Sequence, residues 1–237
     1  MSIITFINEK GGVGKTSVCF NVAWELSKRG QKVLMIDMDG QKANLSFFAG
    51  VDKTCEFFTM LDVFKKNIKL QSAVKNIKAN LDIVPADSSV ASLDMSAKVS
   101  KFRKALESVQ DSYDFIFIDV NPAPGWSHYL SLSISDFAVV VMLPDIASLE
   151  GNKGILETIE EIQETNNSQL KILGIVFNKN NDRTVLARQV SEVAEKISTQ
   201  HKTKIFQTKI RNSVTMSENL ISHQGVTDYA PTSAVAE

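Results

Sequence analysis

The feature that most constrains the fold is a glycine-rich loop near the start of the chain. Residues 10–16 read Lys-Gly-Gly-Val-Gly-Lys-Thr, the apolar run 3–7 precedes them, and a helical pattern follows. Glycines let the backbone approach an anion closely, and successive N–H groups with a helix N-terminus then bind it. We expect Lys15 to reach the β- and γ-phosphates of a nucleotide and Thr16 to bind Mg²⁺. A glycine-rich turn could match by chance, but the order strand, loop, helix favours a phosphate-binding loop.

Length and composition exclude several classes of protein. The chain has 237 residues and a formal net charge of −1, which suits one domain and does not indicate a globally basic nucleic-acid binder. Two cysteines, Cys19 and Cys55, cannot build a disulfide framework or a Cys-rich metal site. Glu9 and Lys10 interrupt the first apolar run, which argues against a signal sequence, and runs such as 137–143 are too short to span a bilayer. We therefore expect a cytoplasmic protein.

Apolar strand patterns alternate with amphipathic helical patterns along the chain. Strands that are apolar throughout predict a parallel sheet buried on both faces. The predicted fold is α/β, a single-domain P-loop NTPase over residues 1–237 with a mostly parallel twisted sheet, helices on both faces and no N-terminal helix-turn-helix domain. The expected strands cover residues 3–7, 32–37, 81–85, 113–120, 137–143, 170–177 and 205–210. The expected helices cover residues 18–28, 57–64, 70–77, 96–109, 151–166 and 184–198.

Two acids stand at the ends of predicted strands. Asp37 closes the strand 32–37, and Asp119 follows four apolar residues in the strand 113–120. In a parallel sheet, ligands lie beyond the carboxyl ends of the strands, so both acids are expected to face the phosphates. The arrangement at Asp119 indicates a Mg²⁺ site in which the acid acts through a water molecule. Such an acid could instead cap a helix or sit in a turn, but the phosphate-binding loop in the same sheet favours the metal.

Two loops carry a resemblance to a known family. The loop 10–16, with its early lysine, and the segment 37–41, Asp-Met-Asp-Gly-Gln, resemble the deviant phosphate loop and switch I of the MinD/ParA family. Gly40 stands where that family usually has a proline. The resemblance implies that Lys10 reaches across a dimer interface to the other subunit's phosphates and that Asp39 orients the attacking water. The implied catalytic residues are Lys10, Lys15 and Asp39, and the implied metal-binding residues are Thr16, Asp37, Asp39 and Asp119.

Later segments extend the resemblance over nearly the whole chain. Residues 119–125 stand where the family has switch II, with Asn121 in place of its first proline. Asn178 matches the family position whose side chain meets adenine, and Arg211 lies in a segment that resembles the family's Ile-Pro-Arg-Asn. The implied nucleotide-binding residues are Lys10, Gly11, Gly12, Val13, Gly14, Lys15, Thr16, Ser17, Asn178 and Arg211.

The family contains enzymes with different tasks, and the chain lacks the features of several of them. A nitrogenase-type reductase needs cysteines that hold an iron–sulfur cluster, and Cys19 and Cys55 stand in the wrong places. A MinD-like membrane ATPase needs a C-terminal basic amphipathic helix, and a tyrosine kinase of the family needs a tyrosine-rich tail. A small ParA-type partition ATPase is the interpretation that remains.

That resemblance implies a cycle with ATP and Mg²⁺ as ligands. ATP joins two subunits into a homodimer, the dimer binds duplex DNA without sequence preference, and a ParB-like partner stimulates slow hydrolysis. The protein would be cytoplasmic and nucleoid-associated, with no membrane partner. Arg183 matches a family arginine on the DNA-facing surface. The cations Lys202, Lys204, Lys209 and Arg211 could add to this surface or form an ordinary solvated face.

Two other functions remain as alternatives. The ATPase could position a protein cargo or regulate another factor without DNA segregation. A metabolic amide-forming enzyme of the wider P-loop group is a further possibility, but it needs a substrate domain for which this chain has no room.

Overall fold

A parallel sheet forms the centre of the molecule. The computed structural model describes residues 1–237 except 41–44, 52–56, 67, 87–97, 182–183 and 237. Within this described part the strands form one seven-stranded sheet in the order β3-β4-β2-β5-β1-β6-β7, and only the β3–β4 pair is antiparallel. The strands are β1 (Ser2–Ile7), β2 (Val33–Met38), β3 (Lys75–Lys78), β4 (Leu81–Val84), β5 (Phe115–Val120), β6 (Phe137–Met142) and β7 (Lys171–Phe177).

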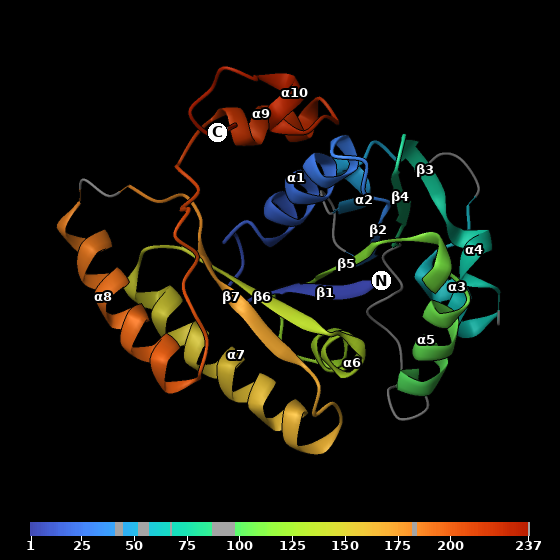
Figure 1. Ribbon diagram of the computed structural model, residues 1–237, viewed down its shortest axis with the longest axis horizontal. Coiled ribbons are helices and arrows are strands. Elements are labelled where there is room, and N and C mark those ends of the chain that lie inside the picture. The colour runs from blue at the N-terminus through green and yellow to red at the C-terminus, as the bar shows by residue number, and fades with distance from the viewer. Residues whose placement is uncertain (41–44, 52–56, 67, 87–97, 182–183, 237) are drawn as a thin grey trace.

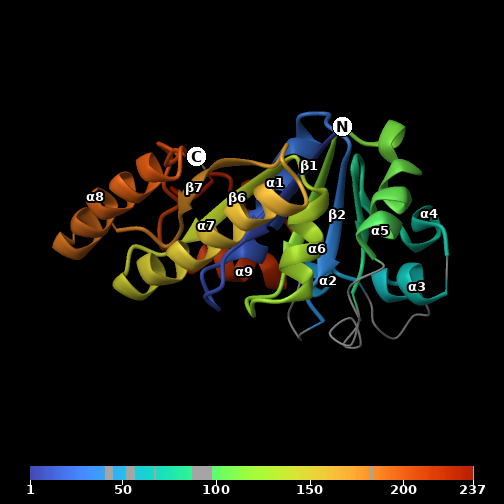
Figure 2. The same ribbon diagram turned by 90° about the horizontal axis from the view of Figure 1, so that it is seen from below.

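Helices cover both faces of this sheet, as the apolar strands predict (Figure 1). The described helices are α1 (Lys15–Lys28), α2 (Leu45–Phe48), α3 (Met60–Lys65), α4 (Leu70–Ala73), α5 (Lys98–Glu107), α6 (Trp126–Ile134), α7 (Ile146–Thr165), α8 (Val185–Gln200), α9 (Thr215–Ile221) and α10 (Val226–Tyr229). A short 3-10 turn covers Gln110–Ser112. Helices α1, α9 and α10 lie on one face, and Figure 2 shows α6 and α7 across the other, with α8 at the outer edge beside α7.

Each face of the sheet has its own apolar core. Alternate residues of β1 divide between the two: Ile3 and Ile7 pack with α5, α6 and α7, whereas Ile4 and Phe6 pack with α1. This division follows from the strand geometry, because successive side chains point to opposite faces. The three-layer α/β fold expected from the sequence is therefore confirmed.

The helix expected over residues 70–77 is wrong in its second half. Helix α4 ends at Ala73, and β3 follows at once and pairs with β4 in an antiparallel hairpin. Asn80 adopts a left-handed φ of 63° in the turn between them. Asparagine tolerates that conformation better than most residues, and the turn lets the chain reverse. An apolar run this short fits a helix and a strand equally well, and the hairpin partner decides between them.

The strand expected over residues 205–210 is also wrong. This segment runs beside β7 but contacts it through separated backbone bonds: Phe206 donates to Ile175 at 2.9 Å, and Ile210 donates to Phe177 at 2.9 Å. Only Ile205 forms a ladder-type bridge with β7, to Ile175. The segment is therefore an irregular connection that carries the chain from α8 to α9.

Several helix boundaries differ from the sequence-based expectation. Helix α7 begins at Ile146 instead of residue 151, because Asp145 caps it by accepting a hydrogen bond from the Ser148 backbone N–H. Helix α3 begins at Met60 instead of residue 57, and α5 ends at Glu107 instead of residue 109. Helices α2, α6, α9 and α10 were not expected.

The carboxyl ends of the central strands meet at one edge of the sheet. Asp37 of β2 and Asp119 of β5 are register partners on neighbouring parallel strands. Strand β1 also runs parallel to β5 and pairs with it, so the loop 8–14, which follows β1, begins at the same edge. The fold thus brings together the loop and the acids that the sequence singles out.

Candidate active site

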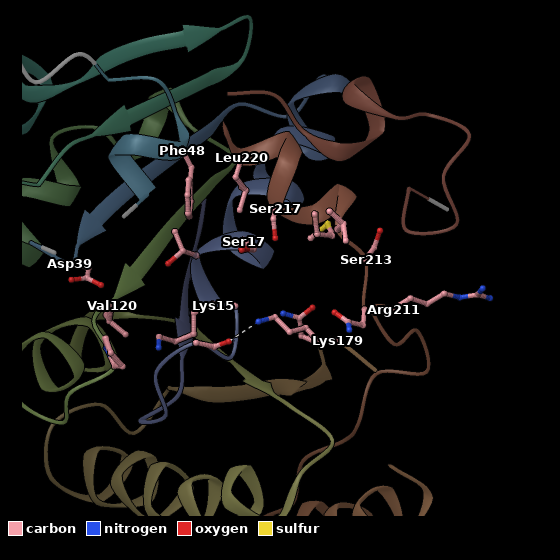
Figure 3. A pocket seen from close by; sticks show the side chains of 18 residues that line it. Lys15, Ser17, Asp39, Phe48, Val120, Lys179, Arg211, Ser213, Ser217 and Leu220 are labelled. Atoms are coloured by element: carbon pink, nitrogen blue, oxygen red, sulfur yellow. Dashed lines mark hydrogen bonds between the residues drawn. The ribbon is translucent and has the colours of Figure 1, made fainter. Parts of the chain in front are cut away.

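A cavity of about 640 Å³ opens at this edge of the sheet (Figure 3). Its walls come from the glycine loop and the start of α1, from the ends of β2 and β5, and from the irregular segment that leads into α9. The lining residues are Gly12, Gly14, Lys15, Thr16, Ser17, Asp39, Phe48, Val120, Pro122, Asn178, Lys179, Arg211, Asn212, Ser213, Val214, Met216, Ser217 and Leu220. Most of the predicted phosphate-binding residues therefore share one cavity with Asn178 and Arg211.

The glycine loop has a backbone that only glycines adopt easily. Gly12 and Gly14 have φ values of 74° and 91°, in the left-handed region. A Cβ on Gly14 would also lie 2.1 Å from the Asn178 amide nitrogen, so a side chain there would collide. Helix α1 begins directly after Gly14, at Lys15. The loop therefore ends in the N-terminus of a 14-residue helix, which favours anion binding.

Lys15 is a buried cation that lines the cavity. It is only 6% exposed, and burial lowers the pKa of its ammonium group while the nearby Asp119 and Asp39 act in the opposite direction. A buried lysine flanked by acids is a positive charge fixed in position before a ligand arrives. Such a preorganised charge stabilises the negative charge of a transferring phosphoryl group.

Asp119 and Thr16 form the part of the site that fits Mg²⁺. The Thr16 hydroxyl donates a hydrogen bond to Asp119 Oδ2 at 2.7 Å, and Asp119 is 0% exposed. Its second oxygen, Oδ1, has no hydrogen-bond partner among the described residues. Burial, with help from Asp37, raises the pKa of Asp119 to about 8. A bound cation would satisfy the unpaired oxygen and favour the ionised acid, so this pair fits a divalent ion.

The protein supplies only some of the ligands that Mg²⁺ needs. Among the described residues, no group of three His, Cys, Asp or Glu side chains stands close enough to hold a metal ion unaided. Mg²⁺ commonly takes its remaining oxygens from substrate phosphates and water. Thr16 and Asp119 are thus suited to a metal that enters with a nucleotide, which would supply charge neutralisation for phosphoryl transfer.

Asp37 has a different environment from Asp119. Both of its oxygens accept hydrogen bonds: Oδ1 from the Asp39 backbone N–H at 2.9 Å, and Oδ2 from the Ser46 backbone N–H at 2.8 Å and from the Ser46 hydroxyl. Burial raises its pKa to about 7, although these hydrogen bonds favour the charged form. Asp37 therefore holds the backbone of Asp39 and of Ser46, which stand before and after residues 41–44 in the sequence. Asp39 itself lines the cavity opposite Ser17 and Lys15 (Figure 3).

Lys10 does not line the cavity and is held by α7 instead. Its ammonium group lies 2.8 Å from both carboxylate oxygens of Asp145, the capping residue of α7, and 3.4 Å from the Ser148 hydroxyl. Partial burial raises the pKa of Asp145, but hydrogen bonds from Lys10 and Ser148 outweigh this effect, so the pKa lies below its usual value. The Lys10 side chain remains 30% exposed.

A second contact ties the same loop to α7. The Lys10 backbone N–H donates to Asn8 Oδ1 at 2.7 Å, and the Asn8 amide donates to Asn152 Oδ1 at 2.8 Å. Asn8 is fully buried. Contacts with α7 therefore hold the first half of the loop, whereas its second half leads directly into α1.

Another part of the cavity lining, formed by Asn178, Lys179 and Arg211, carries a neutral amide and two exposed cations. The Asn178 amide donates to the Val13 carbonyl at 2.8 Å, and Lys179 donates to the Gly12 carbonyl at 3.1 Å, the contact dashed in Figure 3. Arg211 lines the cavity with part of its side chain, but its guanidinium group extends away from the glycine loop (Figure 3). Sequence reasoning predicted Asn178 and Arg211 but missed Lys179, Ser213 and Ser217. The position of Lys179 directly after Asn178 was a usable signal for the first of these.

Arg183 and Gln41 lie outside the described residues. No described helix is long and apolar enough to cross a bilayer.

Comparison with known proteins places this site in a family. The sequence profile of a family described as "AAA domain" matches residues 1–172, and the chain is similar to the sporulation initiation inhibitor protein Soj of Bacillus subtilis. The two are 30% identical over 241 residues, which cover 99% of this chain and 94% of Soj. The chain belongs to the ParA/MinD family of P-loop ATPases. The virulence plasmid ParA family protein pGP5-D of Chlamydia psittaci is 31% identical over 244 residues, covering 100% and 91% of the two chains.

A solved ParA/MinD-family structure has the same fold over nearly the whole of this chain. The septum site-determining protein MinD of Pyrococcus horikoshii, solved with Mg-ADP, is 26% identical and superposes with a TM-score of 0.77. The superposition covers 99% of this chain and 91% of MinD. The family profile ends at residue 172, before Asn178 and α9, but Soj and pGP5-D match beyond it. The part of the chain that contains Asn178 and α9 is thus also matched in these relatives.

Proposed function

We propose that this ParA/MinD-family ATPase is a partition-type switch that binds ATP with Mg²⁺, dimerises and then binds duplex DNA without sequence preference. A ParB-like partner stimulates its slow hydrolysis of ATP and releases the dimer, so that a plasmid, chromosome or other DNA cargo moves. The protein is then associated with the nucleoid. Similarity to the chromosome-partitioning ATPase Soj of Treponema pallidum, which is 31% identical to this chain over 221 residues, and to pGP5-D supports the partition role.

The position of Lys10 is the observation that most supports the formation of a dimer. Lys10 belongs to the glycine loop, yet its ammonium group faces α7 and stands outside the chain's own cavity. A lysine at the rim, partly exposed and paired with the single carboxylate of Asp145, is able to exchange that partner for a phosphate of a second copy. Surface ion pairs of this kind are worth only about 0–1 kcal/mol, so the exchange costs little.

Hydrolysis requires a positioned water and charge neutralisation more than covalent chemistry. Lys15 lies at the phosphate end of the cavity, and Thr16 with Asp119 is suited to the metal. Asp39 lines the cavity at the same end, where it can orient a water for attack on the γ-phosphate. These residues support ATP hydrolysis as the reaction.

The irregular segment after α8 supports DNA binding. Residues 197–217 contain Lys202, Lys204, Lys209 and Arg211 but no Asp or Glu, although the whole chain has a net charge of −1. Lys202, Lys204 and Arg211 are exposed. Lys209 lies over the Phe177 ring, 5.5 Å from its centroid, and is only partly exposed. A sequence segment with several exposed cations and no acids of its own fits the footprint of phosphate-backbone contacts.

Size measurement in solution tests the dimer. Light scattering after size exclusion should give a monomer with ADP and a dimer with Mg²⁺ and a slowly hydrolysed ATP analogue. Lys10→Ala should remain a monomer with the analogue, while the control Lys153→Ala, which removes an exposed lysine from α7, should dimerise normally. Dimerisation of Lys10→Ala would refute the role assigned to Lys10.

Binding to random duplex DNA tests the partition role. Fluorescence anisotropy at low salt should detect DNA binding by the ATP-bound dimer and not by the ADP form. Arg183→Ala should weaken binding equally for all sequences. It should also reduce the slope of affinity against salt, because a complex with one phosphate contact fewer releases fewer counterions when it forms. The control Arg29→Ala removes an equal charge from the residue that directly follows α1. A dimer that ignores DNA would exclude partition and favour the positioning of a protein cargo.

A further inference from the structure

Two buried polar side chains at the start of α6 have no part in the functions described so far. Ser127 and His128 are 1% and 2% exposed. The Ser127 hydroxyl donates to Asn121 Oδ1 at 2.7 Å, and His128 Nε2 lies 2.7 Å from the Asn121 backbone oxygen. The first turn of α6 therefore holds both carbonyl groups of one residue in the loop after β5.

The bond to Asn121 determines which nitrogen of His128 carries the proton. A backbone carbonyl only accepts hydrogen bonds, so Nε2 is the donor. The other nitrogen, Nδ1, is buried without a partner among the described residues. Burial, assisted by the positive charge of Lys15, lowers the pKa of His128 and keeps the ring neutral. A neutral donor aimed at one carbonyl orients a peptide without adding charge beside the phosphates.

Asn121 connects this contact to the cavity. It stands two residues after Asp119, and the next residue, Pro122, lines the cavity. A Cβ on Gly11 would lie 3.8 Å from Pro122 Cγ, so this proline packs beside the glycine loop. Pro122 keeps Asn121 out of the helical region, but Asn121 has no ring to fix its own φ. The two hydrogen bonds from α6 supply the restraint that the sequence lacks at this position.

We propose that Ser127 and His128 are positioning residues for ATP hydrolysis, which fix the Asn121–Pro122 peptide against the glycine loop. This inference rests on the proposed ATPase function. Pro122 lines the cavity beside Gly11 of the glycine loop, whereas Asn178 and Arg211 come from other segments of the lining. Loss of the restraint should therefore slow the chemical step and leave nucleotide affinity nearly unchanged.

Two amide substitutions at the same position separate the hydrogen bond from the packing. In His128→Gln the side-chain amide reaches about as far as Nε2 and can donate to the Asn121 carbonyl. In His128→Asn the amide is equally polar but stops near the position of Nδ1. Ser127→Ala removes the second bond with a minimal change in volume and serves if both histidine variants unfold. Thermal melting with and without Mg-ADP establishes which variants are folded.

Single-turnover hydrolysis of ATP and calorimetric binding of Mg-ADP give the required separation of rate and affinity. We expect His128→Asn and Ser127→Ala to hydrolyse ATP about tenfold more slowly, because small misplacements near a reacting centre have large effects on rate. Their affinity for Mg-ADP should stay within about twofold of the wild type, and His128→Gln should keep most of the rate.

Three results would overturn the inference: an unchanged rate in His128→Asn or Ser127→Ala, a parallel loss of rate and affinity, or a His128→Gln variant as slow as His128→Asn. Failure of the wild-type protein to hydrolyse ATP would instead refute the proposed function itself.

Discussion

Two regions of the cavity are built in different ways: the phosphate end, around Lys15 and Asp119, where we propose that the phosphates of the nucleotide bind, and the base end, around Asn178 and Arg211, where we propose that its base binds. At the phosphate end, Lys15, Asp119 and Asp37 are buried at the ends of regular elements, and their charges shift one another's pKa. At the base end, Asn178 directly follows β7 and presents a neutral amide, and Arg211 is exposed on the irregular connection after α8. The phosphate end is therefore organised electrostatically before a ligand arrives, while the base end offers shape and hydrogen bonds.

The largest effect is expected from the charge at the centre of the phosphate end. Lys15→Ala should reduce the rate of ATP hydrolysis by about 10²–10³-fold or more, because it removes a preorganised charge from the transferring phosphoryl group. Arg211→Ala is the matched control, since it removes a cation that lines the same cavity but whose guanidinium group points away from the glycine loop, so it should change the rate far less. Steady-state phosphate release measures both. Equal losses in the two variants would show that the ends do not differ in this way.

The second test uses pH and the protein without ligands. Asp119 and Asp37 have pKa values raised to about 8 and about 7, so the folded state binds protons that the unfolded state has lost. Their contribution to stability is present below about pH 4 and is lost as pH rises through about 7–8, by at most about 1.4 kcal/mol per pH unit for each acid. Urea unfolding between pH 5 and pH 8 should show this decline.

Two changes should flatten that decline. Asp119→Asn removes one of the two acids, and saturating Mg-ADP favours the ionised form of Asp119. An identical pH slope in the wild type, in Asp119→Asn and in the Mg-ADP complex would mean that the buried acids at the phosphate end do not control stability.

The same contrast explains what the sequence could predict. The phosphate end comes from contiguous residues, 10–16, and from acids that close apolar strands, so local spacing was enough to find Lys15, Thr16 and Asp119. The base end joins residues that are far apart, and its geometry depends on a segment whose backbone contacts with β7 are too widely spaced for a strand. Apolar periodicity therefore predicted a strand at 205–210 that is absent, and it did not reveal Ser213 or Ser217.

The rim of the phosphate end marks another limit of sequence reasoning. The motif identified Lys10 as unusual, but only the fold shows that Asp145 and Ser148 hold it. The same applies to α6, which was not expected and which places Ser127 and His128 beside Asn121. Contacts over more than a hundred residues, such as Lys10 to Asp145, follow from topology and have no signature in local sequence.

A moderate effect is expected from the buried amide at the base end. Asn178→Ala removes the donor to the Val13 carbonyl and leaves that carbonyl without its partner, at a cost of about 1–3 kcal/mol. Nucleotide affinity should fall by about tenfold with little pH dependence, because no charge is lost. Calorimetry with ADP measures this, and Asn212→Ala, an exposed residue of the same wall, is the control. A strong pH dependence of the Asn178→Ala effect would contradict a neutral base end.

The smallest effect is expected from Arg211→Ala. The size of this effect decides whether the Arg211 side chain stays away from a bound nucleotide. The guanidinium group extends away from the glycine loop and is exposed, so Arg211→Ala should change ADP affinity by less than about twofold. The same variant should weaken binding of the ATP-bound dimer to random duplex DNA, because an exposed cation in an acid-free segment contributes a phosphate contact. A loss of ADP affinity of about tenfold or more would mean that Arg211 folds over the base when nucleotide is bound. The base end would then gain a charge of its own, and the contrast with the phosphate end would hold only for the ligand-free protein.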